Sequence, residues 1–153
     1  QPIIRYEIDD VIAITSEPCP CGNPLPRVKT IAGRANDQFW VVNGKGETLE
    51  MSNFIFKDAF LHFFDLAEYQ VIQTGRNAFK ILIEVVPGST LTTEKIRTSI
   101  KDLLNTEGIE VNLECDIHIV PKIPHDGKSG KLRRFINQAG PPADKVVGVV
   151  GLP

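Results

Sequence analysis

The sequence has no long apolar run and no marked excess of charge of one sign. No stretch approaches the roughly 18 apolar residues needed to span a bilayer. Its 17 Lys and Arg residues against 19 Asp and Glu residues give a formal net charge of −2, whereas a dedicated nucleic-acid-binding protein is usually basic. Residues 1–10 lack the basic region and apolar core of a secretory signal. These absences favour a soluble, cytoplasmic protein that binds neither a membrane nor nucleic acid.

Cysteine is also scarce, with three residues at positions 19, 21 and 115. An odd number without a repeated spacing does not indicate a disulfide framework, and a reducing, cytoplasmic setting is the simpler interpretation. Cys19 and Cys21 offer two soft ligands, whereas a structural zinc site normally takes four. Zinc bound with the help of ligands from elsewhere is one interpretation of this pair, and two metal-free loop thiols are the other.

The composition that remains is that of an ordinary globular protein. Hydrophobic residues make up 42% and charged residues 24% of the 153 positions, as is typical of soluble domains. The chain is long enough to bury a core without disulfides. Its length fits one domain, or one domain with a strip of another.

The first 35 residues predict strands and loops without a helix. Segments 11–16 and 27–31 have strand patterns, and a loop rich in proline separates them. Such strands bury little by themselves, so we expect residues 1–35 to be the end of a larger N-terminal domain. The polar break at 33–37 then marks a domain boundary.

Residues 36–138 predict a compact domain of strands and helices. The strand at 39–42 is followed by Asn43-Gly44, a strong signal for a hairpin turn. The hydrophobic periodicity predicts further strands and helices: strands at 69–74, 79–86 and 109–119, and helices at 53–64 and from Thr92 to about Leu104. In the first helix, Phe56, Phe60, Phe63 and Phe64 share one face, which predicts core packing.

The predicted fold class is therefore α+β. It comprises a small C-terminal domain with a β-hairpin and a mainly antiparallel sheet covered by helices, preceded by a β-rich strip of a larger N-terminal domain. Residues 139–153 form a C-terminal tail without an assigned role.

Three short motifs carry the chemical information: Arg5-Tyr6-Glu7-Ile8-Asp9-Asp10, Gly33-Arg34-Ala35-Asn36-Asp37 and Lys128-Ser129-Gly130-Lys131-Leu132-Arg133-Arg134. Their order and spacing resemble the adenylate-forming, AMP-binding superfamily of acyl-CoA synthetases, luciferases and peptide-synthetase adenylation domains. The Cys19-Pro20-Cys21-Gly22 loop between the first two motifs resembles the phenylacetate-CoA ligase and coenzyme F390 synthetase-like branch.

The resemblance implies nucleotide binding at the first two motifs. Asp10, with Tyr6 in the same motif, would hold the ribose hydroxyls of ATP, a role that suits a carboxylate because it accepts hydrogen bonds from both. Arg34 would approach the nucleotide. Asn36 and Asp37 would form the hinge of a mobile C-terminal domain, since hinges concentrate large φ/ψ changes in a few residues. From the residues alone, a solvated turn and an ordinary interdomain loop are the alternatives.

Lys131 matches the lysine of the family's Ser-Gly-Lys signature, which implies a catalytic role. Negative charge gathers around the attacking carboxylate and the α-phosphate during adenylation, and a lysine ammonium on a flexible loop supplies positive charge there. A solvated basic turn is the alternative. The hairpin residues Gly44, Lys45 and Gly46 would face the thioester-forming site, where the thiol acceptor reacts.

The resemblance thus implies the C-terminal fragment of an ATP-dependent, AMP-forming acid–thiol ligase. The full-length enzyme would use ATP and Mg²⁺ to activate a carboxylic acid, with an aromatic acid as the leading candidate, and would transfer the acyl group to coenzyme A. A carrier protein as the acceptor and a standalone, non-catalytic α+β binding or regulatory module are the alternatives. The isolated chain is expected to be inactive, and homodimer formation is left open.

Overall fold

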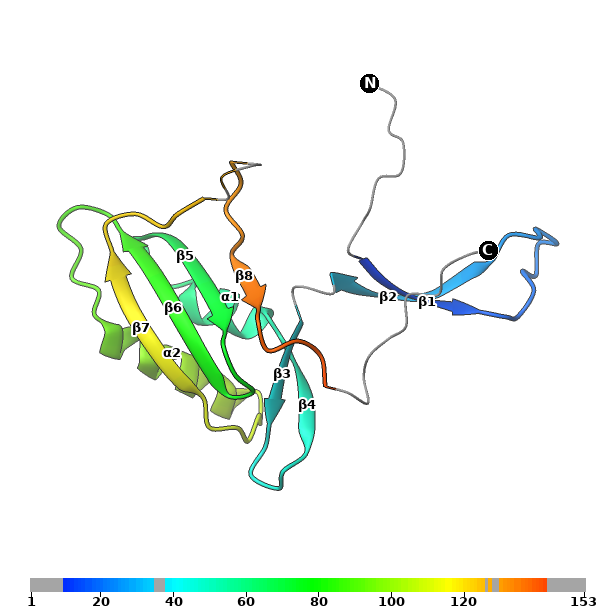
Figure 1. The fold of residues 1–153 in the computed structure, drawn as a ribbon, viewed down its shortest axis with the longest axis horizontal. Coiled ribbons are helices and arrows are strands. Elements are labelled where there is room, and N and C mark those ends of the chain that lie inside the picture. The colour runs from blue at the N-terminus through cyan, green and yellow to red at the C-terminus, as the bar shows by residue number, and fades with distance from the viewer. Residues whose placement is uncertain (1–9, 35–37, 126, 128–129, 143–153) are drawn as a thin grey trace.

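The computed structural model describes residues 10–34, 38–125, 127 and 130–142 of the chain. The elements follow in the order β1 (Asp10–Thr15), β2 (Arg27–Arg34), β3 (Gln38–Val42), β4 (Thr48–Ser52), α1 (Phe54–Phe60), β5 (Leu66–Gln73), β6 (Ala78–Val85), α2 (Thr93–Thr106), β7 (Glu114–Val120) and β8 (Phe135–Asn137) (Figure 1). Neither helix in this part of the chain is long and apolar enough to cross a membrane.

β1 and β2 form a two-stranded antiparallel sheet of their own. Ile12, Ile14 and Val28 on these strands are exposed, and the hydrophobic core cluster of the described residues begins only at Phe39. β2 extends to Arg34, beyond the predicted end of this strand at residue 31, because β1 supplies pairing partners as far as Asp10. The domain boundary predicted at 35–36 lies outside the described residues and stays a prediction.

β3 and β4 form the predicted hairpin, with its turn at the predicted position. The backbone N–H of Gly46 donates to the carbonyl oxygen of Asn43 (3.0 Å). The side-chain Oδ1 of Asn43 accepts from the backbone N–H groups of Lys45 (3.0 Å) and Glu47 (2.9 Å). The hairpin turn predicted at Asn43-Gly44 is confirmed: Asn43 closes it with its side chain, and Gly46 takes the left-handed conformation (φ +81°) that glycine adopts readily.

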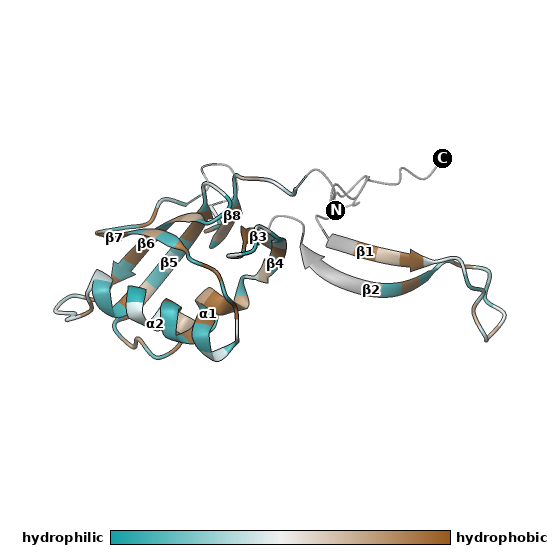
Figure 2. Ribbon diagram, turned by 90° about the horizontal axis from the view of Figure 1, so that it is seen from below, coloured by the Kyte–Doolittle hydropathy of each residue, from teal (hydrophilic) through white to brown (hydrophobic). Residues whose placement is uncertain are grey.

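The four-stranded sheet has the order β7-β6-β5-β8. Its central pair, β5 and β6, is antiparallel, and both outer strands run parallel to their neighbours. The β1–β2 and β3–β4 pairs are antiparallel as well, so antiparallel pairing predominates among the described strands. Both helices cover the same face of the four-stranded sheet (Figure 2). The predicted α+β fold class is confirmed.

The core lies between the helices and this sheet. β6 alternates as predicted, since Phe79, Ile81 and Ile83 are all buried. α2 presents its apolar stripe to them with Ile96, Ile100 and Leu104. The helix begins where predicted, because the Thr92 side chain accepts a hydrogen bond from the backbone N–H of Lys95 (3.3 Å) and so satisfies one of the N–H groups left open at a helix start.

Phenylalanine rings join the hairpin, α1 and the sheet. The ring of Phe39 lies 5.8 Å from that of Phe56, 5.2 Å from that of Phe79 and 6.1 Å from that of Phe135, all with edge-to-face geometry. The predicted stripe of α1 is correct at Phe56 and Phe60. It is wrong at Phe64, which is 92% exposed, because the helix ends at Phe60 and two successive turns lead the chain into β5.

Two differences concern the edges of the sheet. β7 begins at Glu114 rather than at residue 109, because its partner β6 begins at Ala78 and leaves residues 109–113 without a strand to pair with. Ile109, Val111 and Leu113 still pack against the core. β8 was not predicted at all, since its three residues form a strand only by adding to the edge of β5.

Candidate functional site

The loop that carries Lys131 connects β7 to β8 and is fixed to the sheet at its first end by Ile123. The side chain of Ile123 is fully buried. Its backbone N–H donates to Oε2 of Glu84 on β6 (3.0 Å). Because Ile123 comes shortly after the end of β7, this contact fixes the point at which the loop leaves the sheet.

The second end of the loop is held by an ion pair and two backbone contacts. Arg134 donates from Nε and Nη2 to the two carboxylate oxygens of Glu68, each at 2.7 Å. The carbonyl oxygen of Arg134 accepts from the backbone N–H of Val71 (2.8 Å), and that of Arg133 accepts from the side-chain amide of Gln70 (2.8 Å). All three partners lie on β5, so the loop returns to the sheet at a defined position.

The pKa shifts of the ion pair agree in direction. Partial burial raises the pKa of Glu68, but the hydrogen bonds and charge of Arg134, together with the backbone N–H of Tyr69, bring it below its ordinary value. The hydrogen bonds from Arg134 to Glu68 raise the pKa of Arg134. Both shifts favour the charged forms, as a bidentate guanidinium–carboxylate pair should.

Lys131 itself lies on the exposed part of this loop. It follows Gly130, whose φ of +65° lies in the left-handed region that is costly for residues with a Cβ. Nδ1 of His125 lies 3.1 Å from the carbonyl oxygen of Gly130, across the loop. The loop thus carries Lys131 at the surface while both of its ends are anchored to the sheet. Ser129, of the same motif, lies outside the described residues.

Two of the predicted nucleotide-binding residues occupy facing positions. Asp10 at the start of β1 is the cross-strand partner of Arg34 at the end of β2, and partners in an antiparallel pair have Cα atoms about 5 Å apart. The backbone thus brings a carboxylate-bearing and a guanidinium-bearing residue to one end of the ribbon. Tyr6 and the hinge residues Asn36 and Asp37 lie outside the described residues.

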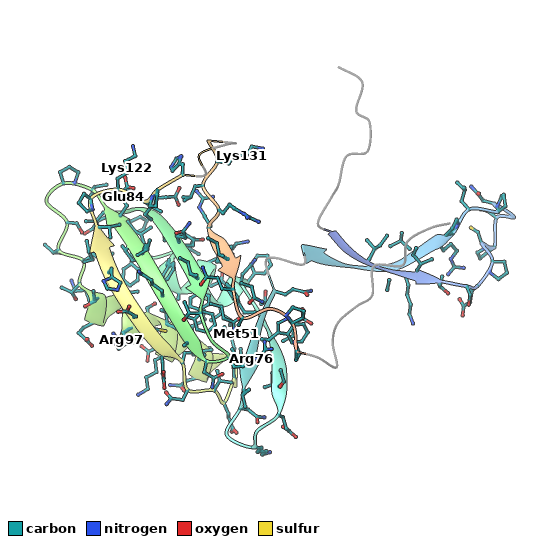
Figure 3. The ribbon with its side chains drawn as sticks, viewed as in Figure 1. Met51, Arg76, Glu84, Arg97, Lys122 and Lys131 are labelled. Atoms are coloured by element: carbon teal, nitrogen blue, oxygen red, sulfur yellow. The ribbon has the colours of Figure 1, made fainter. Side chains whose placement is uncertain are left out.

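The predicted thiol-acceptor residues Gly44, Lys45 and Gly46 lie in the exposed turn between β3 and β4. This turn and the loop between β7 and β8 lie at opposite ends of the domain (Figure 1). Figure 3 shows Lys131 near one end and Arg76, which lies in the β5–β6 turn beside β3, towards the other. The fold therefore does not bring these two predicted functional segments together.

Cys19 and Cys21 lie in the loop between β1 and β2. Their Sγ atoms are 2.9 Å apart, and the turn that places them is closed by a hydrogen bond from the backbone N–H of Gly22 to the carbonyl oxygen of Cys19 (2.9 Å). The contact with Cys19 and a backbone contact with Asn23 lower the pKa of Cys21. Within the described ranges, no group of three or more His, Cys, Asp or Glu side chains is arranged to hold a metal ion.

Sequence reasoning missed the residues that anchor these segments. Glu68 and Arg134 are 66 positions apart, and the pairing of their strands cannot be inferred from either segment alone. Gln70 and Gln73 gave a weak signal, because two amides flank the apolar pair Val71-Ile72 in strand β5. Both are buried, and buried amides require hydrogen-bond partners.

Comparisons with known proteins returned similar solved structures only. No family model and no curated protein matches the chain. Acetoacetyl-CoA synthetase from Streptomyces lividans is 21% identical with a TM-score of 0.48, over 82% of this chain and 17% of that one. 2-Hydroxyisobutyryl-CoA ligase, in an open conformation with 2-HIB-AMP and CoA, is 20% identical with a TM-score of 0.41, over 84% and 27%. Its postadenylation state with 2-HIB-AMP is 17% identical with the same TM-score and coverage.

These similar structures are acyl-CoA synthetases and CoA ligases, the proteins that the sequence motifs resemble. The chain spans only about a sixth to a quarter of their length, 17% of the synthetase and 27% of the ligase.

Proposed function

We propose that this chain is the C-terminal part of an adenylate-forming acid–thiol ligase and that Lys131 acts in its adenylation step. The observation that carries the proposal is the construction of the Lys131 loop, which is exposed at Lys131 and anchored to the sheet at Ile123 and Arg134. A loop built in this way presents a positive charge outward while its base stays fixed. The three sequence motifs, in this order, imply a bound nucleotide on which that charge would act.

In the adenylation step, an oxygen of the substrate carboxylate attacks the α-phosphorus of ATP and the bond to pyrophosphate breaks. The products are an acyl-adenylate and pyrophosphate, with Mg²⁺ accompanying the nucleotide. Lys131 stabilises the negative charge that builds up between the attacking carboxylate and the α-phosphate. Lysine suits this task because its ammonium is a compact charge on a flexible stem.

The β1–β2 ribbon contributes the nucleotide contacts of the same site. Asp10 accepts hydrogen bonds from the ribose hydroxyls, and Arg34 approaches the phosphates from the facing strand. Asn36 and Asp37, which come shortly after β2 in the sequence, act as the hinge. These roles rest on the motif resemblance and on the facing positions of Asp10 and Arg34.

The second step passes the acyl group to a thiol, which attacks the acyl carbon and releases AMP. We assign the turn Gly44–Gly46 to this step, with coenzyme A as the acceptor and an aromatic acid as the substrate, as in the phenylacetate-CoA ligase-like branch. The opposite placement of this turn and the Lys131 loop supports a rotation between the steps (Figure 1). A single orientation of the domain presents one end to the active site and turns the other away.

The direct test is Lys131→Ala in the full-length protein. We expect pyrophosphate release from acid and ATP to fall by about 10²–10³-fold, the usual cost of removing a group that stabilises transition-state charge. Thioester formation from supplied acyl-adenylate should be retained. Lys122→Ala removes a lysine near the start of the same loop and serves as the matched control, with both steps unchanged.

Two results would contradict the proposal. Equal loss of both half-reactions in Lys131→Ala would mean that the substitution disrupts the fold or that another residue is the catalytic lysine. A full-length protein without a phosphate-binding loop and substrate domain upstream of Gln1 would favour the alternative of a non-catalytic binding module.

We also propose Cys19 and Cys21 as two ligands of a zinc ion. Their Sγ atoms lie 2.9 Å apart, so a small widening of this distance would let both bind one Zn²⁺ at about 2.3 Å, and two further ligands would come from outside the described residues. Metal analysis of the full-length protein, with Cys21→Ser as the comparison, should give about one zinc per chain for the wild type and a large loss in the variant. A metal-free wild-type protein would leave the cysteines as ordinary loop thiols.

A further inference from the structure

The outer edge of β3 is paired with side-chain amides rather than with another strand. In an antiparallel hairpin, every second residue directs its backbone N–H and C=O away from the partner strand. On β3, the residues directed outward are Gln38, Trp40 and Val42. An uncovered edge of this kind would be left to water or to another chain.

Three amide side chains form hydrogen bonds with the outward-directed backbone groups of β3. Gln73 accepts from the backbone N–H of Trp40 (3.2 Å) and donates to its carbonyl oxygen (2.6 Å). Asn77 accepts from the N–H of Val42 (2.7 Å) and donates to its carbonyl oxygen (2.8 Å). These are the two bonds that a residue of a neighbouring strand would make, because a side-chain amide carries the same donor and acceptor as a peptide group.

The third amide side chain lies on β8. Asn137 on β8 donates to the carbonyl oxygen of Gln38 (2.7 Å). The amides of Asn137, Gln73 and Asn77 thus meet β3 at successive outward-facing positions. We call these three side chains the amide row.

The amide row is itself held in place by hydrogen bonds to the β5–β6 turn and to the segment after β8. Gln73 donates a second hydrogen bond to the carbonyl oxygen of Arg76 (2.9 Å), and Arg76 donates to the carbonyl oxygen of Gly140 (2.6 Å). The N–H of Gly140 donates to Oδ1 of Asn137 (2.9 Å), which closes the network. Gln73 is fully buried, so its bonds form away from competing water.

Asn77 is the member of the row next to the functional turn. Asn77 binds both the backbone N–H and the carbonyl oxygen of Val42. Val42 directly precedes Asn43, the residue that closes the turn. The orientation of Gly44, Lys45 and Gly46 relative to the sheet is therefore set at Val42. The core contacts of Phe39 hold the other end of β3.

We propose that Asn77 is a positioning residue for the thioester-forming step, and that Gln70 is its counterpart for the adenylation step. This inference rests on the proposed function. Asn77 fixes the β3–β4 turn at one end of the domain, whereas Gln70 fixes the Lys131 loop at the other through the carbonyl oxygen of Arg133 (2.8 Å). The two amides therefore hold separate functional segments, and their substitution affects separate half-reactions.

The test measures both half-reactions in the full-length protein carrying Asn77→Ala, Asn77→Asp or Gln70→Ala. Asn77→Asp keeps the side-chain volume but sets a carboxylate oxygen against the carbonyl oxygen of Val42. Both Asn77 variants should slow thioester formation from supplied acyl-adenylate by about tenfold or more, since small misplacements of reacting groups carry costs of this size. Their pyrophosphate release should stay within about twofold of the wild type. Asn105→Ala, which removes an exposed amide on α2, is the matched control.

Gln70→Ala should show the reverse pattern, with pyrophosphate release reduced and thioester formation retained. Hydrogen exchange followed by mass spectrometry adds a readout independent of activity. In the Asn77 variants, peptides covering residues 40–47 should exchange faster, while those of α2 should not change. A general loss of stability would accelerate exchange in both regions and lower both half-reactions.

Thioester formation within twofold of the wild type in both Asn77 variants, with adenylation intact, would overturn the inference and leave the proposed function standing. Equal losses of the two half-reactions would overturn it as well. A wild-type protein that releases no pyrophosphate with any carboxylic acid would overturn the proposed function and, with it, this inference.

Discussion

The bidentate pair between Glu68 and Arg134 should stabilise the domain by about 1 kcal/mol at neutral pH. Hydrogen bonds to charged groups contribute about 1.5–3 kcal/mol, and exposed ion pairs about 0.2–1 kcal/mol. The side chain of Glu68 is 24% exposed and that of Arg134 is 52% exposed, so solvent screening keeps the energy of the pair within the range for exposed ion pairs. Both bonds are 2.7 Å long, and this geometry favours the upper part of the exposed range.

A double-mutant cycle measures this coupling. We would unfold the 153-residue chain with urea as the wild type, as Glu68→Gln, as Arg134→Met and as the double variant. The coupling energy is the stability loss of the double variant minus the summed losses of the two single variants. Glu68→Gln retains an acceptor for the backbone N–H of Tyr69, so it chiefly removes the charge. We expect about 1 kcal/mol at pH 7, equivalent to about a fivefold change in the folding equilibrium.

The direction in which the coupling energy changes with pH follows from the pKa of Glu68. Arg134 lowers the pKa of Glu68 in the folded state, so the contribution is present above the unfolded pKa of about 4.3 and is lost as the pH falls through the lower, folded value. The coupling should therefore be lost once the pH falls below the folded pKa of Glu68. Arg97 and Glu94, an exposed pair 3.6 Å apart on α2, serve as the control, with about 0.5 kcal/mol or less. A Glu68–Arg134 coupling below about 0.3 kcal/mol at pH 7, or one unchanged in acid, would refute this reasoning.

Two further predictions concern the core and the thiols. Phe79→Ala should cost about 3–5 kcal/mol in urea unfolding because Phe79 is buried among other rings, whereas Phe64→Ala should change stability by no more than about 0.5 kcal/mol; similar costs would contradict the assigned end of α1. Burial raises the pKa of Cys115 to about 11, so iodoacetamide at pH 8 should leave it unmodified in the folded, metal-free chain, while Cys21, whose pKa is lowered, reacts. Peptide mapping by mass spectrometry reads both sites, and equally fast labelling would show that Cys115 is accessible.

The sequence by itself determined the elements whose burial pattern is local. The alternation of Phe79, Ile81 and Ile83, and the periodic stripe of Ile96, Ile100 and Leu104, specify one buried face each, and the tertiary structure uses those faces. The Thr92 cap is equally local, since the side chain binds a backbone N–H three residues further on. The motif around Lys131 is likewise recognised from its own consecutive residues.

Only the tertiary structure decided what depends on a partner distant in sequence. Residues 109–113 alternate like a strand but have no strand beside them, whereas Phe135–Asn137 become β8 because β5 offers an edge. Glu68 and Gln70 anchor the Lys131 loop across more than 60 positions, and the amide row binds β3 across 33 to 99 positions. Hydrogen bonds of this kind have no periodic signature, because each depends on where the folded backbone places its partner.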